Sequence, residues 1–599
     1  MLIKALCDYA DKIEEEPDST KIPDGWSEQK VSFRILLTPD GEVADIIDLR
    51  VDKNNILKNG KVKVSYEPVN MILPERTQKT CINSNIIEHR PLYIFGLNFD
   101  KEKLTTDDKG KAAKSHEAFV KCNLEFFDGL DSEICQAYRN FIHKWIPEKE
   151  IENPHLLSIG KLYKSSYFCF GLNGHPEITL EKDEQFIKKY SEYIENKSSN
   201  KTDTDCAICG ILGEKLPISR IHDKIKFPGG NSVGCVLVGM NETAFESYGK
   251  KQSYNSNISE VAMKKYTSAL NKLLTDKKHF TKIDDMIIVY FAMKSNDSPE
   301  CQIMSMFFGD VTEQTDDNLN KIFSDTAGGM VANLSSVGAD SNVTFYIAGM
   351  TSNSSRICQK FVYRDKFGKL MENLIQHQED LCINPEKRRQ VYFSSIAKQL
   401  LSPKSSKEKI PPPLMSGIIL AAFNGTNYPK ALLDNVVRRV KIDSDTEKNY
   451  FVKLNDIRAG IIKACINRKL RLSGQKEEIT MSLNKENHDP AYLSGRLFAV
   501  LEKIQQDASG GNLNKTIKDS YFSSACSRPS SIFPKLIQLS QYHIKKLSDG
   551  NIVFYQKLIG EIMDGMIDKF PHILDLDSQG KFIIGYYHQN KALYTKNND

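Results

Sequence analysis

Before residue 402, the apolar positions form short runs bounded by Pro, Gly or Asp, a pattern typical of β-strands. Residues 31–37 and 43–50 lie on either side of a Pro-Asp-Gly turn, which predicts a hairpin. Residues 91–97, 286–293 and 342–350 are further apolar runs, and we interpret each as a buried strand.

Helical spacing is interleaved with these strand-like runs. Leu2, Ile3, Leu6 and Tyr9 fall on one face of a helix, and another helix is expected to begin near Ser115. The first 200 residues are therefore predicted to mix helices and strands, and the region after them to do the same.

Beyond residue 413 the strand pattern almost disappears. Apolar residues recur at alternating spacings of three and one along residues 493–508 and again along residues 555–570. Such stripes are more often bundle core than cofactor or membrane contact, so we expect an antiparallel helical bundle. The predicted fold class is α+β, with mixed α/β N-terminal and central regions followed by an all-α C-terminal bundle.

Two polar stretches mark expected boundaries between these regions. Residues 195–205 are rich in Asn, Ser, Thr and Asp, and residues 402–413 are rich in Lys and Pro. We therefore expect three segments, at residues 1–200, 201–402 and 403–599.

Composition narrows the protein class. Hydrophobic residues make up 40% and charged residues 26% of the 599 residues, as in ordinary globular proteins. The net charge of +4 excludes a strongly basic nucleic-acid coat but leaves room for local basic grooves. Thirteen scattered cysteines argue for a reducing compartment, and no apolar run is long enough to span a membrane. We expect a cytoplasmic protein with no membrane partner.

One segment carries three of the four ligands of a Cys-Cys-His-His zinc finger. Cys206 and Cys209 form a C-x2-C pair, and His222 follows after twelve residues. The second histidine is missing from residues 226–228, and Cys235, which could replace it, lies in an apolar run. Buried or incidental thiols are therefore the favoured interpretation, and we expect no metal here.

Catalytic signatures are weak. The pairs His222-Asp223 and His488-Asp489 could begin a metal-dependent nuclease site, but such sites need further ligands. None of the six Gly-Lys dipeptides is followed by Ser or Thr, so the chain has no Walker A loop, and it has no G-x-S-x-G elbow. We expect no catalytic residue and no cofactor.

Local basic runs are the remaining candidate chemistry. Residues 387–409 carry seven Lys or Arg against one acid, and residues 458–471 carry five against none. An isolated charge run is usually a solvated surface, but two in a near-neutral chain favour a groove for backbone phosphates. The loop at residues 74–85 is dense in Arg, Thr, Gln, Lys and Asn, which reach phosphates and base edges, although a hydrated loop has the same composition.

Longer stretches indicate a family. They include "PDGWSEQKVSF" near the start, "AFESYGKKQSYNSNISE" from Ala244, "FYIAGMTSNSSR" from Phe345 and "NGTNYPKALLDNVVRR" from Asn424. Near the end, "PAYLSGRLFAVLEKIQQDA" and "IFPKLIQLSQYHIKKL" add to them. In these stretches the chain resembles the large subunit of the type I-C CRISPR surveillance complex, Cascade, which is a Csd-type CRISPR-associated protein.

The resemblance implies a non-catalytic subunit of an RNA-guided DNA-binding complex. Its partners would be CRISPR RNA and the other Cascade subunits, double-stranded target DNA with a PAM, and the displaced single strand. It would recognise the PAM duplex, aid R-loop formation, and dock a helicase–nuclease recruited in trans. A metal-dependent nuclease and a protein-only scaffold are the alternatives.

Residue chemistry and resemblance together suggest three groups of DNA-contacting residues. Asn, Gln and Lys donors in the 74–85 loop suit the acceptors of the minor groove. In the central segment, "FPGGNSVG" lets the backbone approach a phosphate, although a structural turn explains it equally well. The basic runs are candidates for unspecific strand or guide contact. The candidates are Arg76, Thr77, Lys79, Asn83 and Asn85 in the loop; Lys224, Lys226, Asn231, Ser232, Tyr248, Lys251, Gln252 and Asn255 in the central segment; and Lys387, Arg388, Arg389, Arg458, Lys463, Arg468, Lys469 and Arg471 in the basic runs.

The resemblance also raises the possibility of an internal translation start. In type I-C systems the small subunit can arise from within the large-subunit gene, and a start at Met481 or Met415 would yield such a fragment here. The region from about residue 481 is accordingly expected to be small-subunit-like.

Overall fold

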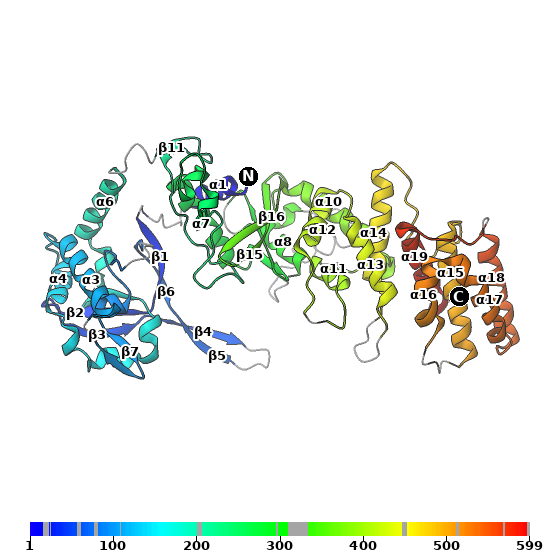
Figure 1. Ribbon diagram of the computed structural model, residues 1–599, viewed down its shortest axis with the longest axis horizontal. Coiled ribbons are helices and arrows are strands. Elements are labelled where there is room, and N and C mark those ends of the chain that lie inside the picture. Colours follow the sequence, from blue (N-terminus) through cyan, green and yellow to red (C-terminus); the bar gives the residue numbers. More distant parts are fainter. Residues whose placement is uncertain are drawn as a thin grey trace. The chain divides into compact units, whose positions relative to one another are not determined.

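The computed structural model divides the chain into two compact units (Figure 1). It describes residues 1–15, 23, 25–56, 62–76, 82–107, 109–199, 206–294, 298–309, 334–405, 407–445, 452–510, 513, 515–566 and 569–595. Asp18–Asp205 form one unit, here called the insert unit. Met1–Pro17 and Cys206–Asp599 form the other, here called the main unit. The insert unit thus interrupts the sequence of the main unit after its first helix.

The insert unit is built around a four-stranded sheet with the strand order β10-β9-β2-β3. The predicted hairpin is confirmed, because β2 (Phe33–Leu37) pairs antiparallel with β3 (Val43–Asp48). On its other side β2 pairs in parallel with β9 (Phe168–Leu172), which pairs with β10 (His175–Thr179). Aromatic side chains of these strands and of α3 (Lys111–Phe127), α4 (Glu133–Lys144) and α6 (Glu184–Ser199) form the core.

Smaller elements complete the insert unit. Among the described pairings, three strand pairs lie outside the four-stranded sheet, and two of them are β1 (Trp26–Val31) with β6 (Val69–Pro74) and β4 (Val51–Ile56) with β5 (Val62–Glu67). A short hairpin joins β7 (Asn98–Asp100) to β8 (Lys103–Thr105). The short helices are α5 (Pro154–Ile159), η1 (Pro147–Lys149), η2 (Gly160–Ser165) and η3 (Leu180–Lys182).

The strand predicted at residues 91–97 is wrong, since this segment forms the helix α2 (Pro91–Phe95). Pro91 occupies the first turn, where its missing N–H is not needed, and Gly96 ends the helix with a left-handed φ of 67°. Tyr93, Ile94 and Phe95 are all buried, so the apolar run has no exposed face to reveal its period.

The main unit contains a four-stranded antiparallel sheet between two layers of helices. Its strands are β13 (Phe280–Ile283), β14 (Met286–Ala292), β15 (Thr344–Asn353) and β16 (Arg356–Lys366), in that order. Met286, Ile288 and Tyr290 belong to a core with α8 (Pro299–Phe308), α10 (Phe367–Leu381) and α12 (Pro412–Asn424). The alternate residues Ile287, Val289 and Phe291 pack with α1 (Leu2–Glu14) and α7 (Glu260–Thr275). Because β14 is covered on both faces, its sequence is continuously apolar.

Several short elements lie between the end of the insert unit and α7. They are β11 (Cys206–Ile208), β12 (Lys215–Pro217), η5 (Thr243–Phe245) and η6 (Gln252–Ser256). η7 (Leu334–Val337) precedes β15, and η8 (Pro385–Lys387) follows α10.

The described residues from 412 to 594 form helices and connecting segments only, as predicted. After α11 (Phe393–Leu400) and α12 come α13 (Lys430–Ile442), α14 (Asp456–Leu472), α15 (Pro490–Ala508), α16 (Ile517–Ser527), α17 (Pro529–Ile544), α18 (Asp549–Asp564) and α19 (Leu576–Tyr594). The α+β fold class is confirmed. No helix among the described residues is long and apolar enough to cross a membrane.

Of the two expected segment boundaries, one lies near the junction between the two units and the other does not. Residues 195–205 lie next to the junction between the two units, whereas residues 402–413 lie within the main unit. There, Lys409 pairs with Asp285 and the Ile410 amide donates to Asp284. Met481 lies between α14 and α15, whereas Met415 is buried within α12.

Candidate nucleic-acid interface

The cations expected on α14 are largely internal. Arg458 and Arg468 are each only 1% exposed and Lys463 is 5% exposed. Arg458 donates to Asp443 at 2.8 Å, and Arg468 donates to Asp380 at 2.6 Å. As folded here, these three side chains do not present their charges to a phosphate, which corrects the expectation from the sequence.

Asp380 on α10 is contacted by three of the five cations of this α14 run. It accepts hydrogen bonds from Arg468 and Arg471, and Lys463 donates to the backbone carbonyls of Glu379 and Asp380. Burial alone would raise the pKa of Asp380, but the charges of Arg468 and Arg471 outweigh it and hold the pKa below its ordinary value. The run therefore ties α14 to α10.

The two outermost cations of this run are also paired. Arg471 bonds Glu477 as well as Asp380, and the exposed Lys469 bonds Asp577 at 2.5 Å. In the other basic run, Arg388 and Arg389 are exposed after η8, and Arg388 pairs with Glu379 at 2.9 Å. The side chain of Lys387 lies outside the described residues.

The 74–85 loop has described residues at its two ends, 74–76 and 82–85. Arg76 stacks on the ring of Tyr167, with its guanidinium carbon 4.8 Å from the ring centre, and donates to the Tyr167 hydroxyl. Asn85 is 3% exposed and donates its amide to Glu88, which corrects the expectation that Asn85 reaches DNA. Asn83 is half-buried and its carbonyl accepts from Arg90. Thr77 and Lys79 lie outside the described residues.

Glu88 organises the segment that follows this loop. Its carboxylate is fully buried and accepts six hydrogen bonds from Asn85, His89 and Arg90. Burial alone would raise the pKa of Glu88, but the bonds and charge of Arg90 hold it below its ordinary value. Sequence reasoning missed Glu88, Arg90 and Tyr167, because nothing in the local pattern shows that they meet.

The glycine-rich part of the central segment is a closed loop with an exposed basic surface. Ile225 and Cys235 exchange backbone hydrogen bonds of 2.7 and 2.8 Å, and these bonds close the loop at its base. A Cβ at Gly230 would lie 2.4 Å from the Cys235 sulfur and 3.1 Å from the Phe227 carbonyl oxygen, so a larger residue would force this tight loop to shift. The predicted residues Lys224, Lys226, Asn231 and Ser232 are all exposed around it.

Another cation near this loop comes from the sheet. Lys282 lies on β13 and is exposed, and its ammonium nitrogen is 3.9 Å from where a Cβ of Gly229 would stand. Sequence reasoning missed Lys282, because only the fold brings it to a loop more than fifty residues away in the chain.

A second loop of the central segment presents an aromatic ring to solvent. Ser247 and Lys250 pair across a two-residue turn in which Tyr248 and Gly249 have left-handed φ values of 53° and 71°. Positive φ at both central positions defines a type I′ turn, and Tyr248 at its tip is 99% exposed. Lys251 next to it is also exposed.

Asn255 holds this turn in place. Its carbonyl oxygen accepts from the Ser247 amide, and its amide nitrogen donates to the carbonyls of Lys250 and Gln252. Gln252 accepts from Arg220 at 3.1 Å. Asn255 and Gln252 therefore support the turn, while Tyr248 and Lys251 are the members of this group presented outward.

Of the possible zinc ligands, Cys206 is partly exposed, and the others, Cys209, His222 and Cys235, are buried in the interior. Cys209 is buried and accepts from the Ser259 amide at 3.3 Å, and His222 hydrogen-bonds the Tyr266 hydroxyl at 2.6 Å. Burial lowers the pKa of His222 to about 4, so the ring is neutral at neutral pH. Among the described residues, no group of three or more His, Cys, Asp or Glu side chains could hold a metal ion.

The second His-Asp pair has structural partners. Asp489 caps α15 by accepting from the amides of Ala491 and Tyr492, and it pairs with Lys581. The His488 ring hydrogen-bonds the Gly565 carbonyl.

The fold and surface define a two-unit α+β protein with exposed basic loops in its central segment. A family model described as CRISPR-associated protein (Cas_Csd1) matches residues 6–594. The chain belongs to the Csd1 family of CRISPR-associated proteins, and the resemblance to a Csd-type large subunit is confirmed. No curated protein sequence matches the chain.

Proposed function

We propose that this chain is the non-catalytic large subunit of a type I-C CRISPR RNA-guided surveillance complex, and that the central segment contacts the PAM-bearing duplex. Family membership supports the assignment to such a complex. The exposed lysines around the 225–235 loop support the contact with DNA, and they are the observation on which this part of the proposal depends.

Phosphate contact accounts for the chemistry of the glycine-rich loop. Lys224, Lys226 and Lys282 supply positive charge from three positions around a loop whose glycines let a phosphate come close to the backbone. Asn231 and Ser232 add neutral donors on the same loop. These groups position a duplex without reading its sequence.

Base contact is assigned to the hairpin tip. A tyrosine ring that is fully exposed at the end of a supported turn can lie against base edges or between base steps, while Lys251 beside it contacts the backbone. The 74–85 loop is the second candidate for contact with the duplex; at its described ends Arg76 donates to Tyr167 and the Asn83 carbonyl accepts from Arg90.

The remaining roles follow from the family alone. We infer that the chain binds CRISPR RNA and other Cascade subunits, aids R-loop formation, holds the displaced strand and docks a helicase–nuclease. A non-catalytic role is supported by the engagement of His222 and Asp489 in structural hydrogen bonds.

The duplex contact is tested by replacing Lys224, Lys226 and Lys282 with Ala in the assembled complex. We expect weaker binding to PAM duplex, with the slope of log K against log salt shallower by about 0.9 for each phosphate that is no longer neutralised. Guide loading, measured by co-purification of CRISPR RNA, should be unchanged.

The matched control replaces three other exposed lysines, Lys369, Lys557 and Lys569, and should leave both the affinity and the slope unchanged. PAM-duplex affinity that is equal in the two triple variants would remove the central segment from the proposed interface.

A further inference from the structure

The C-terminal bundle has a basic segment that the earlier basic runs do not include. Residues 513–548, which span α16 and α17, contain six Lys or Arg and one acid, Asp519. Since the whole chain has a net charge of only +4, this segment carries more net positive charge than the rest of the protein combined. The exposed cations of such a segment can attract an anionic partner.

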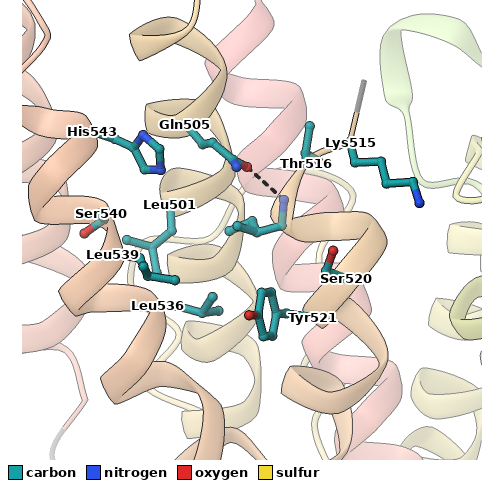
Figure 2. A pocket seen from close by; sticks show the side chains of 11 residues that line it. Leu501, Gln505, Lys515, Thr516, Ser520, Tyr521, Leu536, Leu539, Ser540 and His543 are labelled. Carbon is teal, nitrogen blue, oxygen red and sulfur yellow. Dashed lines mark hydrogen bonds between the residues drawn. The ribbon is translucent and has the colours of Figure 1, made fainter. Parts of the chain in front are cut away.

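A cleft of about 270 Å³ opens between α15, α16 and α17 at this segment (Figure 2). Its apolar side is formed by Leu501, Ile517, Leu536 and Leu539, and the ring of Tyr521 lines it beside them. The volume is slightly below the roughly 300–1,000 Å³ of typical small-molecule sites. It therefore suits a single flat ring system better than a large cofactor.

Polar groups stand at one end of this cleft. Figure 2 shows Gln505 and His543 close together there, with Thr516 and Lys515 across from them. The Gln505 side-chain oxygen accepts from the Ile517 amide at 2.8 Å, which fixes the orientation of its amide group. Burial and the nearby Lys546 lower the pKa of His543, so its ring is neutral at neutral pH and can donate or accept a hydrogen bond.

The cations around the cleft differ in how they are engaged. Lys518 pairs with Asp445 at 2.8 Å, and Lys535 lies over the Tyr521 ring at 5.3 Å from its centre. Lys515 precedes α16, and Lys545 and Lys546 follow α17; all three are exposed. No ion pair of these three occurs within the described ranges. They are therefore available to phosphates beside the cleft.

We propose that this cleft, the α16–α17 cleft, binds one unstacked base of a single-stranded nucleic acid while Lys515, Lys545 and Lys546 contact the flanking phosphates. The proposal rests on the proposed nucleic-acid role of the chain but concerns a separate surface. Bases in a duplex are stacked and paired, so their faces cannot enter a cleft between helices, whereas single strands offer them to aromatic and apolar side chains. An acidic peptide would match the lysines but not the apolar side of the cleft.

The test measures binding of the full-length chain to labelled oligothymidylate, the matching RNA strand, a strand with abasic sites and a blunt duplex. Tyr521→Leu should weaken binding of the intact strand about tenfold, because a base contributes strongly when it stacks on an aromatic ring. The abasic strand should be unaffected by Tyr521→Leu. Comparison of the DNA and RNA strands shows which of the two the cleft prefers.

Two lysine variants test the phosphate contacts. The double variant Lys515→Ala, Lys546→Ala should bind single strands with a shallower slope of log K against log salt. The slope should change by about 0.7 for each phosphate that is no longer neutralised. Lys557→Ala, on the exposed surface of α18, is the control and should leave the slope unchanged. Binding of PAM duplex through Lys224, Lys226 and Lys282 should be retained in these variants, so failure of one proposal does not entail failure of the other.

Photocrosslinking of the unsubstituted protein provides a readout that does not depend on variant folding. A strand containing 4-thiothymidine should crosslink within residues 515–546. Crosslinks that map only elsewhere overturn the proposal, as does an equal effect of Tyr521→Leu on intact and abasic strands. The proposal is also overturned if single-strand binding is unchanged in Tyr521→Leu and in the double variant of Lys515 and Lys546. That outcome would assign the cleft to a protein segment.

Discussion

The interior of the main unit contains three cationic side chains, those of Arg458, Lys463 and Arg468. Each of them donates a hydrogen bond to an acceptor there. A buried charge is tolerated only when it is paired and hydrogen-bonded, so these residues fix the packing of α14 against its neighbours. Asp380 is the acceptor shared by Arg468 and Arg471. Its removal leaves Arg468 charged and uncompensated in the core.

We expect Asp380→Asn to lower the free energy of unfolding of the main unit by about 3–5 kcal/mol at neutral pH. Urea denaturation followed by hydrogen exchange in α10 and α14 measures this loss. The pKa of Asp380 is lower in the folded protein than in the unfolded chain, where it is about 4. The ionised carboxylate therefore stabilises the fold fully at a pH above the unfolded-state pKa, and this stabilisation is lost as the pH falls through the folded-state pKa. The difference between variant and parent should therefore shrink in acid.

Glu372→Gln is the control for this prediction, since Glu372 pairs with Lys369 on the exposed surface of the same helix. Its effect should stay below about 1 kcal/mol. Equal effects of the two substitutions would show that the buried pair does not stabilise the contact between α10 and α14.

At the scale of elements, the close packing of α15 on α19 depends on two glycines. A Cβ at Gly495 would lie 2.0 Å from the Phe582 carbonyl oxygen, and one at Gly585 would lie 2.1 Å from that of Tyr492. Both obstacles are backbone atoms, which cannot move aside as a flexible side chain can. The glycines therefore set the distance between the two helices, and with it the frame that carries the α16–α17 cleft.

We expect Gly495→Ala to destabilise the bundle by about 1–3 kcal/mol through overpacking, although alanine favours helix formation over glycine. Thermal unfolding followed by circular dichroism measures the change. Gly560→Ala is the matched control: Gly560 lies within α18 and a Cβ there meets nothing within 4 Å. That variant should be neutral or more stable by up to about 1 kcal/mol. Similar destabilisation of both variants would contradict the packing argument.

At the scale of the molecule, the first helix belongs to a unit that resumes at Cys206. Leu6 and Tyr9 of α1 are buried in the same core as Tyr266 of α7 and Phe291 of β14. The ends of the insert unit are therefore joined to two segments that pack together within the main unit. Stability of the main unit depends on residues at the start of the chain.

We expect Leu6→Ala to weaken the main unit by about 2–5 kcal/mol, because it leaves a cavity between α1 and α7. Hydrogen exchange should speed up in α7 and β14 and stay unchanged in α3 and α4 of the insert unit. Phe170→Ala, in the insert-unit core, should give the reverse pattern. Faster exchange of α3 in Leu6→Ala would show that α1 supports the insert unit instead.

Local periodicity is sufficient to predict many elements of this protein. The continuous apolar run at residues 286–293 predicts β14, and the stripe at residues 493–508 predicts α15, because backbone geometry fixes which neighbours share a face. The run at residues 91–97 gives a wrong prediction because a short helix buried on all sides has no polar face. The structure places Lys224, Lys226, Tyr248 and Lys251, which the sequence suggested as DNA contacts, on the surface.

The sequence by itself determined the α+β class, most helices and strands, and the family, since these depend on spacing and order along the chain. Tertiary structure alone decided that α1 joins the segment after residue 205, that Lys282 stands beside the 225–235 loop, and that Arg458 and Arg468 are internal. A run of lysines and arginines has the same sequence whether it faces solvent or a buried carboxylate. The difference depends on an acceptor such as Asp380, nearly ninety residues from Arg468 in the chain and 2.6 Å from it in the fold.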